Sequence, residues 1–266
     1  MTPSFPDADG GAPAVRILVK LGGRVQQDPA LPAAIADLCR AHPGGVCIVH
    51  GGGDEISTLQ RALGSEPAFV GGRRVTRAED LDLVRMALSG ASNKRLVSAL
   101  GAAGVAAVGV SGEDGGMFLA ERGDPALGCV GRVTRVEPTL VGLLLRAGYL
   151  PVVSPLAREL GTGGALNVNG DDAAAALAIA LGAGEVLFMA DVPGVLEDEA
   201  VIPALDPEGA HALVARGVAA GGMAAKLDAA LAALAGGVPR ARIGGLDALR
   251  DAARGTQITM ARAHAA

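Results

Sequence analysis

The sequence predicts an α/β fold with a mainly parallel sheet. Short runs of aliphatic and β-branched residues, such as 15–19 and 46–49, alternate with helical patterns along most of the chain. Glycines follow shortly after both runs, at Gly22 and at Gly51, which is typical of the tight turns that follow the strands of a parallel sheet. Half of the residues are apolar and only 2% are aromatic, so the core is expected to be aliphatic.

The chain before residue 160 is expected to contain five helical segments and four main strands. Asp28-Pro29 looks like the N-cap and first residue of a helix, and Thr76-Arg77-Ala78-Glu79 has the pattern of a capping box. Ser92 is expected to start a further helical segment that runs to Leu100. The strands are predicted at 15–21, 46–49, 105–110 and 150–153, with a β excursion at 117–136 and helices after 53 and at 138–147.

The Gly/Thr-rich stretch 160–164 is interpreted as a lobe boundary. It divides the chain into a flexible tail at 1–14, a first lobe at 15–164 and a second lobe at 165–266. The second lobe is expected to open with an alanine-rich helix that Asp171 or Asp172 caps. Its other elements are strands at 185–190, 240–243 and 256–260, and helices that begin at Asp206-Pro207 and Gly221-Gly222.

Composition excludes several classes of function. The net charge is −5 and no basic run occurs, so no nucleic-acid partner is expected. The longest uncharged run, 96–112, is interrupted by glycines and serines and reads as a helix end, a turn and a strand, so no membrane span is expected. Three widely spaced cysteines and an N-terminus without a signal-peptide pattern indicate a cytoplasmic protein.

Lysine is rare in this sequence, which has Lys20, Lys94 and Lys226 against twenty arginines. Lys20 lies beside Gly22-Gly23, and Gly51-Gly52-Gly53 follows the second strand. Exposed backbone N–H groups at such positions favour an anion, although glycines can also serve only to permit tight turns. The chain has no GxxxxGK[ST] or GxGxxG phosphate motif, no HxH or HExxH metal spacing and no GxSxG nucleophile motif.

Four other residues are candidates with two interpretations each. Arg74 and Asn167 suit a carboxylate and an amide, but for one arginine among twenty a surface role is the favoured interpretation on the residues alone. Lys226 is either a phosphate ligand or a solvated helix residue. Asp171 is either a helix cap or a carboxylate that holds two lysines in place.

Seven short strings occur in an order that resembles the amino-acid kinase family. The resemblance covers residues 15 to about 260, and its specificity comes from the order rather than from any one string. The strings are Val19-Lys20-Leu21-Gly22-Gly23, Val49-His50-Gly51-Gly52-Gly53, Gly72-Arg73-Arg74-Val75-Thr76, Ser92-Asn93-Lys94, Asn167-Val168-Asn169-Gly170-Asp171, Asp191-Val192-Pro193-Gly194-Val195 and Gly221-Gly222-Met223 with Lys226.

The resemblance implies a three-layer αβα sandwich of the carbamate kinase-like type. It implies ATP-dependent phosphorylation of the side-chain carboxylate of N-acetyl-L-glutamate, in arginine biosynthesis. Lys20 and Lys226 would stabilise the phosphoryl group in flight and Asp171 would orient both lysines. Backbone N–H groups of Gly23, Gly52 and Gly53 would bind the phosphoryl group and the acceptor, and Arg74 and Asn167 would hold the α-carboxylate and amide. The nucleotide would be lined by Asp191, Val192, Pro193, Gly194, Val195, Leu196, Val218, Ala219, Ala220, Gly222 and Met223.

The chemistry agrees with these residue types. The acceptor carboxylate is ionised at neutral pH and needs no general base, so catalysis rests on positioning and positive charge. Mg²⁺ is expected to be held mainly by the ATP phosphates, with no metal site built from protein side chains. The first lobe would bind the acylated amino acid and form a homodimer, and the second would bind ATP.

Two departures and two alternatives accompany the resemblance. The short N-terminal stretch and the run Ala252-Ala253-Arg254-Gly255-Thr256 differ from arginine-inhibited members, so no arginine feedback is expected. The loop has an extra arginine, and of Arg73 and Arg74 we expect Arg74 to contact the substrate. The alternatives are a kinase for a carrier-protein-linked aminoadipate or glutamate, and a non-catalytic sensor on the same fold.

Overall fold

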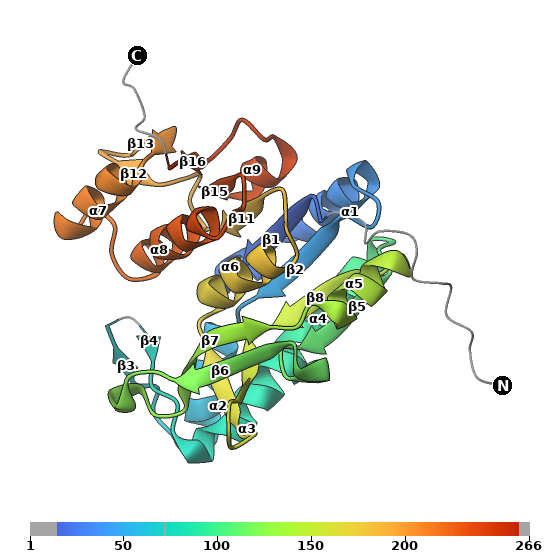
Figure 1. Cartoon of the computed structure of the whole chain (residues 1–266), viewed down its shortest axis with the longest axis vertical. Coiled ribbons are helices and arrows are strands. Elements are labelled where there is room, and N and C mark those ends of the chain that lie inside the picture. Colours follow the sequence, from blue (N-terminus) through green and yellow to red (C-terminus); the bar gives the residue numbers. More distant parts are fainter. Residues whose placement is uncertain (1–14, 72, 261–266) are drawn as a thin grey trace.

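The computed structural model describes residues 15–71 and 73–260, so the predicted tail at 1–14 lies outside the described residues. Its centre is an eight-stranded sheet with the strand order β14-β16-β15-β11-β1-β2-β8-β5 (Figure 1). The pairs within β15-β11-β1-β2-β8-β5 are parallel, and β16 runs antiparallel to β15. The strands are β14 (Ala204–Leu205), β16 (Thr256–Ile258), β15 (Ala241–Gly244), β11 (Val186–Met189), β1 (Ile17–Leu21), β2 (Val46–His50), β8 (Leu150–Ser154) and β5 (Ala107–Ser111).

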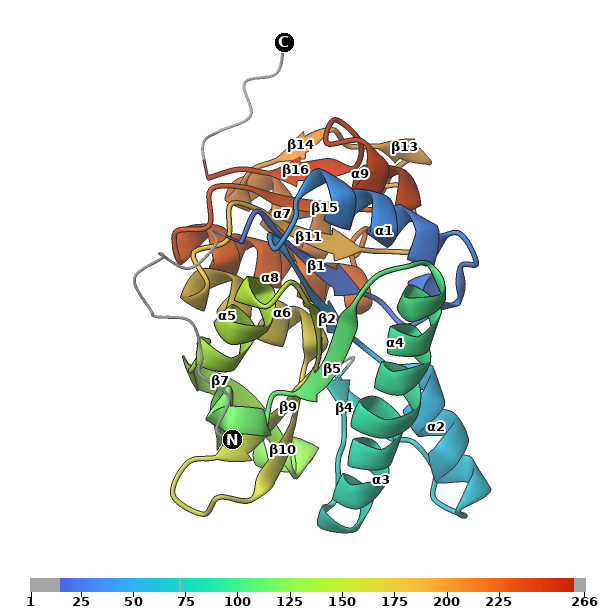
Figure 2. The same cartoon turned by 90° about the vertical axis from the view of Figure 1, so that its right-hand side faces the viewer.

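Helices cover both faces of the sheet and make three layers (Figure 2). Side chains alternate along β1, so Ile17, Val19 and Leu21 pack on one face, whereas Leu18 packs on the other. The first face is covered by α1 (Leu31–Ala41), α4 (Asn93–Ala102) and α9 (Leu246–Arg250), and the second by α5 (Thr139–Arg146), α6 (Gly170–Ala180) and α8 (Gly222–Ala235). By the same alternation Lys20 lies on the face that α6 covers.

A small closed barrel adjoins the sheet. It has the order β10-β7-β6-β9 and consists of β6 (Phe118–Arg122), β7 (Val130–Val136), β9 (Leu156–Glu159) and β10 (Ala165–Val168). The predicted β excursion is therefore confirmed, but its closure into a barrel was not predicted. Residues 160–164 form the turn between β9 and β10, which pair antiparallel within the barrel. The division into lobes at residue 164 stays a prediction.

A helical cluster packs beside the barrel around Ile56, Val84, Leu88 and Leu156. It contains α2 (Gly53–Ala62), η2 (Ala78–Asp80), α3 (Leu81–Arg85) and η3 (Met86–Ser92), and the hairpin of β3 (Phe69–Val70) and β4 (Arg73–Arg74) lies next to it (Figure 1). The predicted capping box is wrong, because Arg77 is the N-cap residue and no side chain caps η2. Thr76 instead forms a β-bridge with Gly128. The helical segment predicted from Ser92 is confirmed as α4, which begins at Asn93 with Ser92 in the N-cap position; the Ser92 side chain makes no capping hydrogen bond, and the π-helical turn η3 leads directly into α4.

The predicted start of the first helix is wrong by two residues. Residues 24–27 form the short helix η1 (Arg24–Gln27), and Asp28 Oδ1 accepts a hydrogen bond from Ala30 N–H before α1 begins at Leu31. The Asp28 side chain therefore stabilises a turn rather than a helix terminus.

The remaining elements are η4 (Asp114–Gly116), η5 (Pro125–Leu127), β12 (Leu196–Glu197), β13 (Ala200–Val201) and α7 (Pro207–Ala215). The predicted cap of α7, Asp206, is confirmed.

Within residues 15–71 and 73–260, no helix combines the length and the hydropathy that crossing a bilayer requires.

Candidate active site

The carboxyl ends of β1, β2 and β11 meet at one edge of the sheet, where ligands bind in open α/β folds. Gly22 and Gly23 follow β1, and Gly51 and Gly52 follow β2 and lead into α2. The loop packs closely at Gly52, where a Cβ would lie 2.8 Å from Leu88 Cδ2 and 2.9 Å from Ser92 Oγ, so any larger residue would force these side chains of the π-helical turn to move. The predicted position of Gly51–Gly53 at a helix N-terminus is confirmed.

Asp171 lies in the first turn of α6 but does not cap it. The cap is Asn169, whose Oδ1 accepts hydrogen bonds from the N–H groups of Asp171 at 2.8 Å and Asp172 at 3.2 Å. The expectation that one of the two aspartates caps this helix is therefore wrong. Because Asn169 satisfies these N–H groups, the Asp171 carboxylate is available for other partners.

Asp171 pairs with both candidate lysines. Lys20 Nζ lies 2.9 Å from Asp171 Oδ1, and Lys226 Nζ lies 3.6 Å from Asp171 Oδ2. The three side chains are at most 11% exposed, so Lys226 is not the solvated helix residue of the alternative interpretation. Burial and the nearby Lys20 ammonium lower the pKa of Lys226, and Asp171 opposes this shift.

Packing of two alanine-rich helices brings these groups together. Lys226 lies in the second turn of α8, and α8 packs along α6, whose first turn carries Asp171. Alanine side chains such as Ala174 and Ala230 are fully buried between the helices and the sheet. Small side chains allow this close approach, which places residues 20, 171 and 226 at one point despite their separation in the sequence.

Two cavities adjoin this cluster. The larger, a cleft of about 460 Å³, is lined by Gly22, Gly23, Asp191, Val192, Gly222, Met223 and Lys226, among others. The smaller, of about 190 Å³, is lined by Gly51, Gly52, Arg73, Arg74, Asn167 and Gly170, among others. Gly53 lines both. This arrangement suits a two-substrate reaction in which a group passes from one cavity to the other.

The segments predicted to line the nucleotide are only partly at the cleft. Asp191, Val192, Gly222 and Met223 line it. Pro193 faces a neighbouring cavity, and Val195 and Ala219 are buried in the core. Gly194, Leu196, Val218 and Ala220 are not among the residues that line the cleft.

Arg74 is held in place at the smaller cavity. Its guanidinium donates hydrogen bonds to Gln60 Oε1 at 2.6 Å, to Gly53 O at 2.7 Å and to Ser57 Oγ at 2.7 Å. It also stacks over the ring of Phe69, 4.8 Å from the ring centre. These contacts come from α2 and β3, so two elements that line the cavity hold Arg74 in position.

The other two candidates at this cavity have different partners. Arg73 lies 3.1 Å from Asp172 Oδ2 and links β4 to the first turn of α6. Asn167 is buried and donates a hydrogen bond to Thr76 Oγ1 at 2.9 Å. Both arginines therefore line the cavity, but only Arg74 is bound to the helix that follows the Gly51–Gly53 loop.

A model of the amino acid kinase family matches residues 15–245. The chain belongs to the amino acid kinase family. A relative from Rubrobacter xylanophilus named acetylglutamate kinase is 46% identical, and the match covers 91% of this chain and 94% of the relative. Another acetylglutamate kinase, from Chloroflexus aurantiacus, is 41% identical over 91% of this chain and 96% of its own length.

Solved structures agree with the fold of this amino acid kinase. The Streptococcus mutans protein smu.665 superposes with a TM-score of 0.84 and 28% identity, and the match covers 93% of this chain and 100% of that protein. The predicted three-layer αβα sandwich with a mainly parallel sheet is therefore confirmed.

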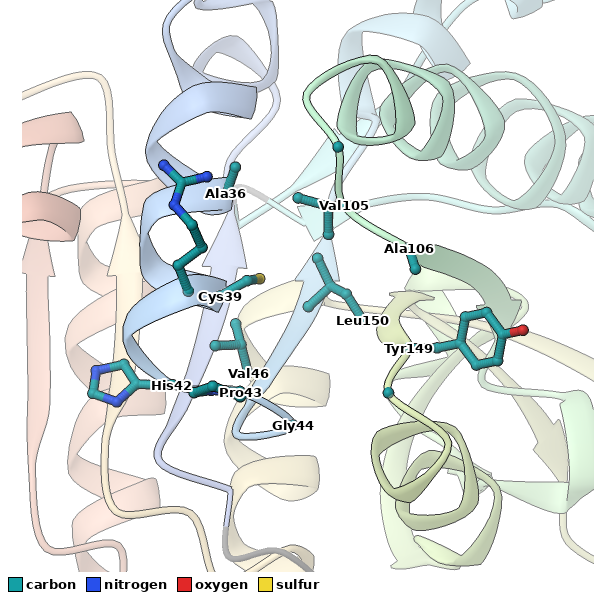
Figure 3. A pocket seen from close by; sticks show the side chains of 13 residues that line it. Ala36, Cys39, His42, Pro43, Gly44, Val46, Val105, Ala106, Tyr149 and Leu150 are labelled. Atoms are coloured by element: carbon teal, nitrogen blue, oxygen red, sulfur yellow. The ribbon is translucent and has the colours of Figure 1, made fainter.

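A larger cavity of about 570 Å³ lies away from the cluster (Figure 3). Val46 and Leu150 are at the amino ends of β2 and β8, and His42 and Tyr149 lie on opposite sides of the cavity. It is thus at the edge of the sheet opposite Lys20, Asp171 and Lys226. Size alone does not identify a candidate site in this amino acid kinase, because the buried lysine and aspartate cluster lies at the carboxyl ends of the strands.

Sequence analysis missed a chain of hydrogen bonds that joins the Gly51–Gly53 loop to the buried side chains of His50 and Asn93. His50 Nδ1–H donates to Gly51 O at 2.8 Å, and His50 Nε2 accepts from Asn93 Nδ2 at 3.0 Å. Asn93 Oδ1 accepts in turn from Lys94 Nζ at 3.1 Å. The signal was the position of a histidine immediately before three glycines, which was considered only for metal binding.

We expect His50 to make the protein less stable in acid. Burial lowers the pKa of His50 from 6.5 to about 4, helped by the charges of Lys20 and Lys94 and opposed by the hydrogen bond to Gly51. The unfolded chain therefore binds this proton more readily, and stability is lost as the pH falls from about 6.5 towards 4. Between pH 7.5 and 5 the loss from this group is about 2 kcal/mol, at 1.36 kcal/mol per pKa unit.

An NMR titration of the His50 ring measures this pKa directly, and urea unfolding of wild type and His50→Asn at the two pH values measures the linkage. The exposed His211, changed to Asn, is the control. A His50 midpoint near 6.5, or equal pH slopes in wild type and His50→Asn, would contradict the prediction.

Proposed function

We propose that this chain is an acetylglutamate kinase, which transfers the γ-phosphoryl group of ATP to the side-chain carboxylate of N-acetyl-L-glutamate in arginine biosynthesis. The names of its relatives support the substrate pair. The observation that carries the proposal is the Lys20–Asp171–Lys226 cluster beside two adjoining cavities. The presence of both lysines together with Asp171 argues against a non-catalytic sensor on the same fold.

The proposed reaction places ATP in the larger cleft and the acylated glutamate in the smaller cavity. Attack by an ionised carboxylate on ATP brings two anions together, so the rate depends on positive charge around the transferring group. In the proposal, Lys20 and Lys226 supply this charge, and Asp171 holds both lysines without neutralising them fully. The N–H groups of Gly23, Gly52 and Gly53 add donors from the strand ends and the N-terminus of α2.

Mg²⁺ belongs to the ATP substrate in this proposal. Within residues 15–71 and 73–260, no group of three or more His, Cys, Asp or Glu side chains could hold a metal ion. When bound with ATP, the ion neutralises phosphate charge. The chain's own contribution is the two lysines and the backbone donors.

An assay of ADP release with N-acetyl-L-glutamate and ATP tests the proposal. Turnover with this acceptor, together with formation of an acyl phosphate that hydroxylamine traps, is the expected result. Activity only with a carrier-protein-linked aminoadipate or glutamate, or no activity with any of these acceptors, would overturn it.

We expect Arg74 to bind the α-carboxylate. Replacing Arg74 by Lys removes the planar fork that can form two parallel hydrogen bonds, so KM for N-acetyl-L-glutamate should rise about 10- to 100-fold with a smaller change in kcat. Arg73→Lys is the matched control and should change KM less than about threefold. Initial rates at varied acceptor concentration measure both, and a larger effect at Arg73 would reverse the assignment.

We also propose that the enzyme is a cytoplasmic homodimer. Its three cysteines are free, as in a reducing compartment. β5 is a terminal strand of the sheet, and four of its five residues are partly exposed, whereas β1, β2 and β8 are buried throughout. Such a surface is suited to a second copy. Light scattering that gives the mass of one chain would overturn the dimer.

A further inference from the structure

One glutamine side chain connects the two glycine loops. Gln26 lies in η1, directly after Gly22-Gly23, and its side chain is partly buried. Its Nε2 donates hydrogen bonds to Gly22 O at 3.2 Å and to Gly51 O at 3.0 Å. A single amide group therefore binds the loop after β1 and the loop after β2 at the same time.

These two carbonyls determine where two backbone donors point. A peptide group is planar and trans, so its C=O and N–H point in opposite directions. The C=O of Gly22 shares a peptide group with the N–H of Gly23, and the C=O of Gly51 shares one with the N–H of Gly52. Fixing each oxygen towards Gln26 therefore turns the N–H of Gly23 and of Gly52 away from it.

Both of these N–H groups are free to bind a ligand. Gly23 lines the larger cleft, and Gly52 lines the smaller cavity. In the part of the chain that the structure describes, neither N–H has a protein acceptor. The two donors thus serve adjacent cavities from peptide groups that one side chain orients.

The two loops depend on Gln26 to different degrees. Gly51 O has a second donor, the buried His50 Nδ1–H at 2.8 Å, which Asn93 supports from the other ring nitrogen. The low pKa of His50 keeps the ring neutral, so this arrangement persists at neutral pH. Gly22 O has no second side-chain donor among the described residues. Loss of the Gln26 amide should therefore disturb the Gly23 N–H more than the Gly52 N–H.

We infer that Gln26 is a positioning residue for phosphoryl transfer, which orients the Gly23 and Gly52 N–H groups towards the transferring group and its acceptor. The inference rests on the proposed function for its kinetic consequence. Donors that are aligned before reaction stabilise the developing charge without reorganisation, so misalignment affects the transition state more than the bound ground state.

Two substitutions separate the amide from the shape of the side chain. Gln26→Glu keeps the shape but presents oxygen to both carbonyls, and Gln26→Met keeps the length without any donor. We expect kcat to fall about 10- to 100-fold in Gln26→Glu and about 10-fold in Gln26→Met, with KM for ATP changed less than threefold. The exposed neighbour Gln27, changed to Glu or Met, is the matched control and should leave kcat within twofold.

A binding measurement makes the test independent of the acceptor. Calorimetry measures the affinity for ADP and the affinity for a non-hydrolysable ATP analogue, and the ratio of the two is the γ-phosphate increment. This ratio should fall about tenfold in Gln26→Glu but stay unchanged in Gln27→Glu. If wild type fails to phosphorylate N-acetyl-L-glutamate, the proposed function is wrong and this increment still decides the role of Gln26.

Unfolding curves identify variants that do not fold. If Gln26→Glu does not fold, the kinetic and binding measurements on Gln26→Met decide the result. A folded Gln26 variant that keeps both kcat and the γ-phosphate increment within twofold of wild type overturns the inference. Equal losses in the Gln26 and Gln27 variants do so as well.

Discussion

Replacing either Lys20 or Lys226 by Arg is expected to lower kcat about 100- to 1,000-fold, with KM for both substrates changed less than about fivefold. The charge is kept, but a guanidinium is larger and flat, whereas the site holds two compact ammonium groups around one carboxylate. Both lysine side chains are at most 11% exposed, so the longer arginine cannot extend into solvent without leaving Asp171. Steady-state kinetics with N-acetyl-L-glutamate and ATP measure the effect.

Unfolding in urea separates chemistry from folding in these variants. Each arginine variant should remain folded, and its affinity for a non-hydrolysable ATP analogue should change far less than kcat. If both variants keep a wild-type kcat, the two lysines are not part of the reaction.

Replacing Asp171 by Asn has the second-largest expected effect. It leaves two buried ammonium groups without a counter-charge, which should lower the free energy of unfolding by about 3 kcal/mol. Burial and Lys20 already lower the pKa of Lys226, and Asp171 is the group that opposes them. Without Asp171 this pKa should fall further, so Lys226 loses its proton at a lower pH and kcat declines earlier on the alkaline side.

The pH profile of kcat distinguishes this role from a purely structural one. Asp228, which is exposed on the same helix as Lys226, provides the matched control as Asp228→Asn. We expect its alkaline limb to coincide with that of wild type. An Asp171→Asn enzyme with an unchanged alkaline limb and wild-type stability contradicts the bridging role.

Local sequence patterns predicted most of the elements, because a strand or helix with a buried face has apolar residues at regular intervals along the sequence. The alternation along β1 is an example: Ile17, Val19 and Leu21 pack on one face and Leu18 on the other, as a strand covered by helices on both sides requires. The errors fall at helix starts. Asp28 and Thr76 have residue types that cap helices, but Asp28 forms a local turn with Ala30 and Thr76 forms a long-range bridge with Gly128.

The candidate site was predicted as a set of residue types, not as an arrangement. The rarity of lysine singled out Lys20 and Lys226, and the ordered strings added Asp171, Arg74 and Asn167. Spacing in sequence could not show that α6 and α8 pack closely enough for one carboxylate to pair with both lysines, because that contact depends on alanines from two helices. It also could not show that Asn169, and not an aspartate, caps α6.

The sequence by itself determined the α/β class, the strand ends with their glycines and the chemical identity of the charged groups. Only the tertiary structure decided which of these groups meet, and it added Gln26, His50 and Asn93, whose hydrogen bonds hold the glycine loops. The physical reason is that strand and helix patterns come from local burial. The direction of a peptide N–H depends instead on partners from other elements, such as the α4 residue Asn93 that supports His50 at the end of β2.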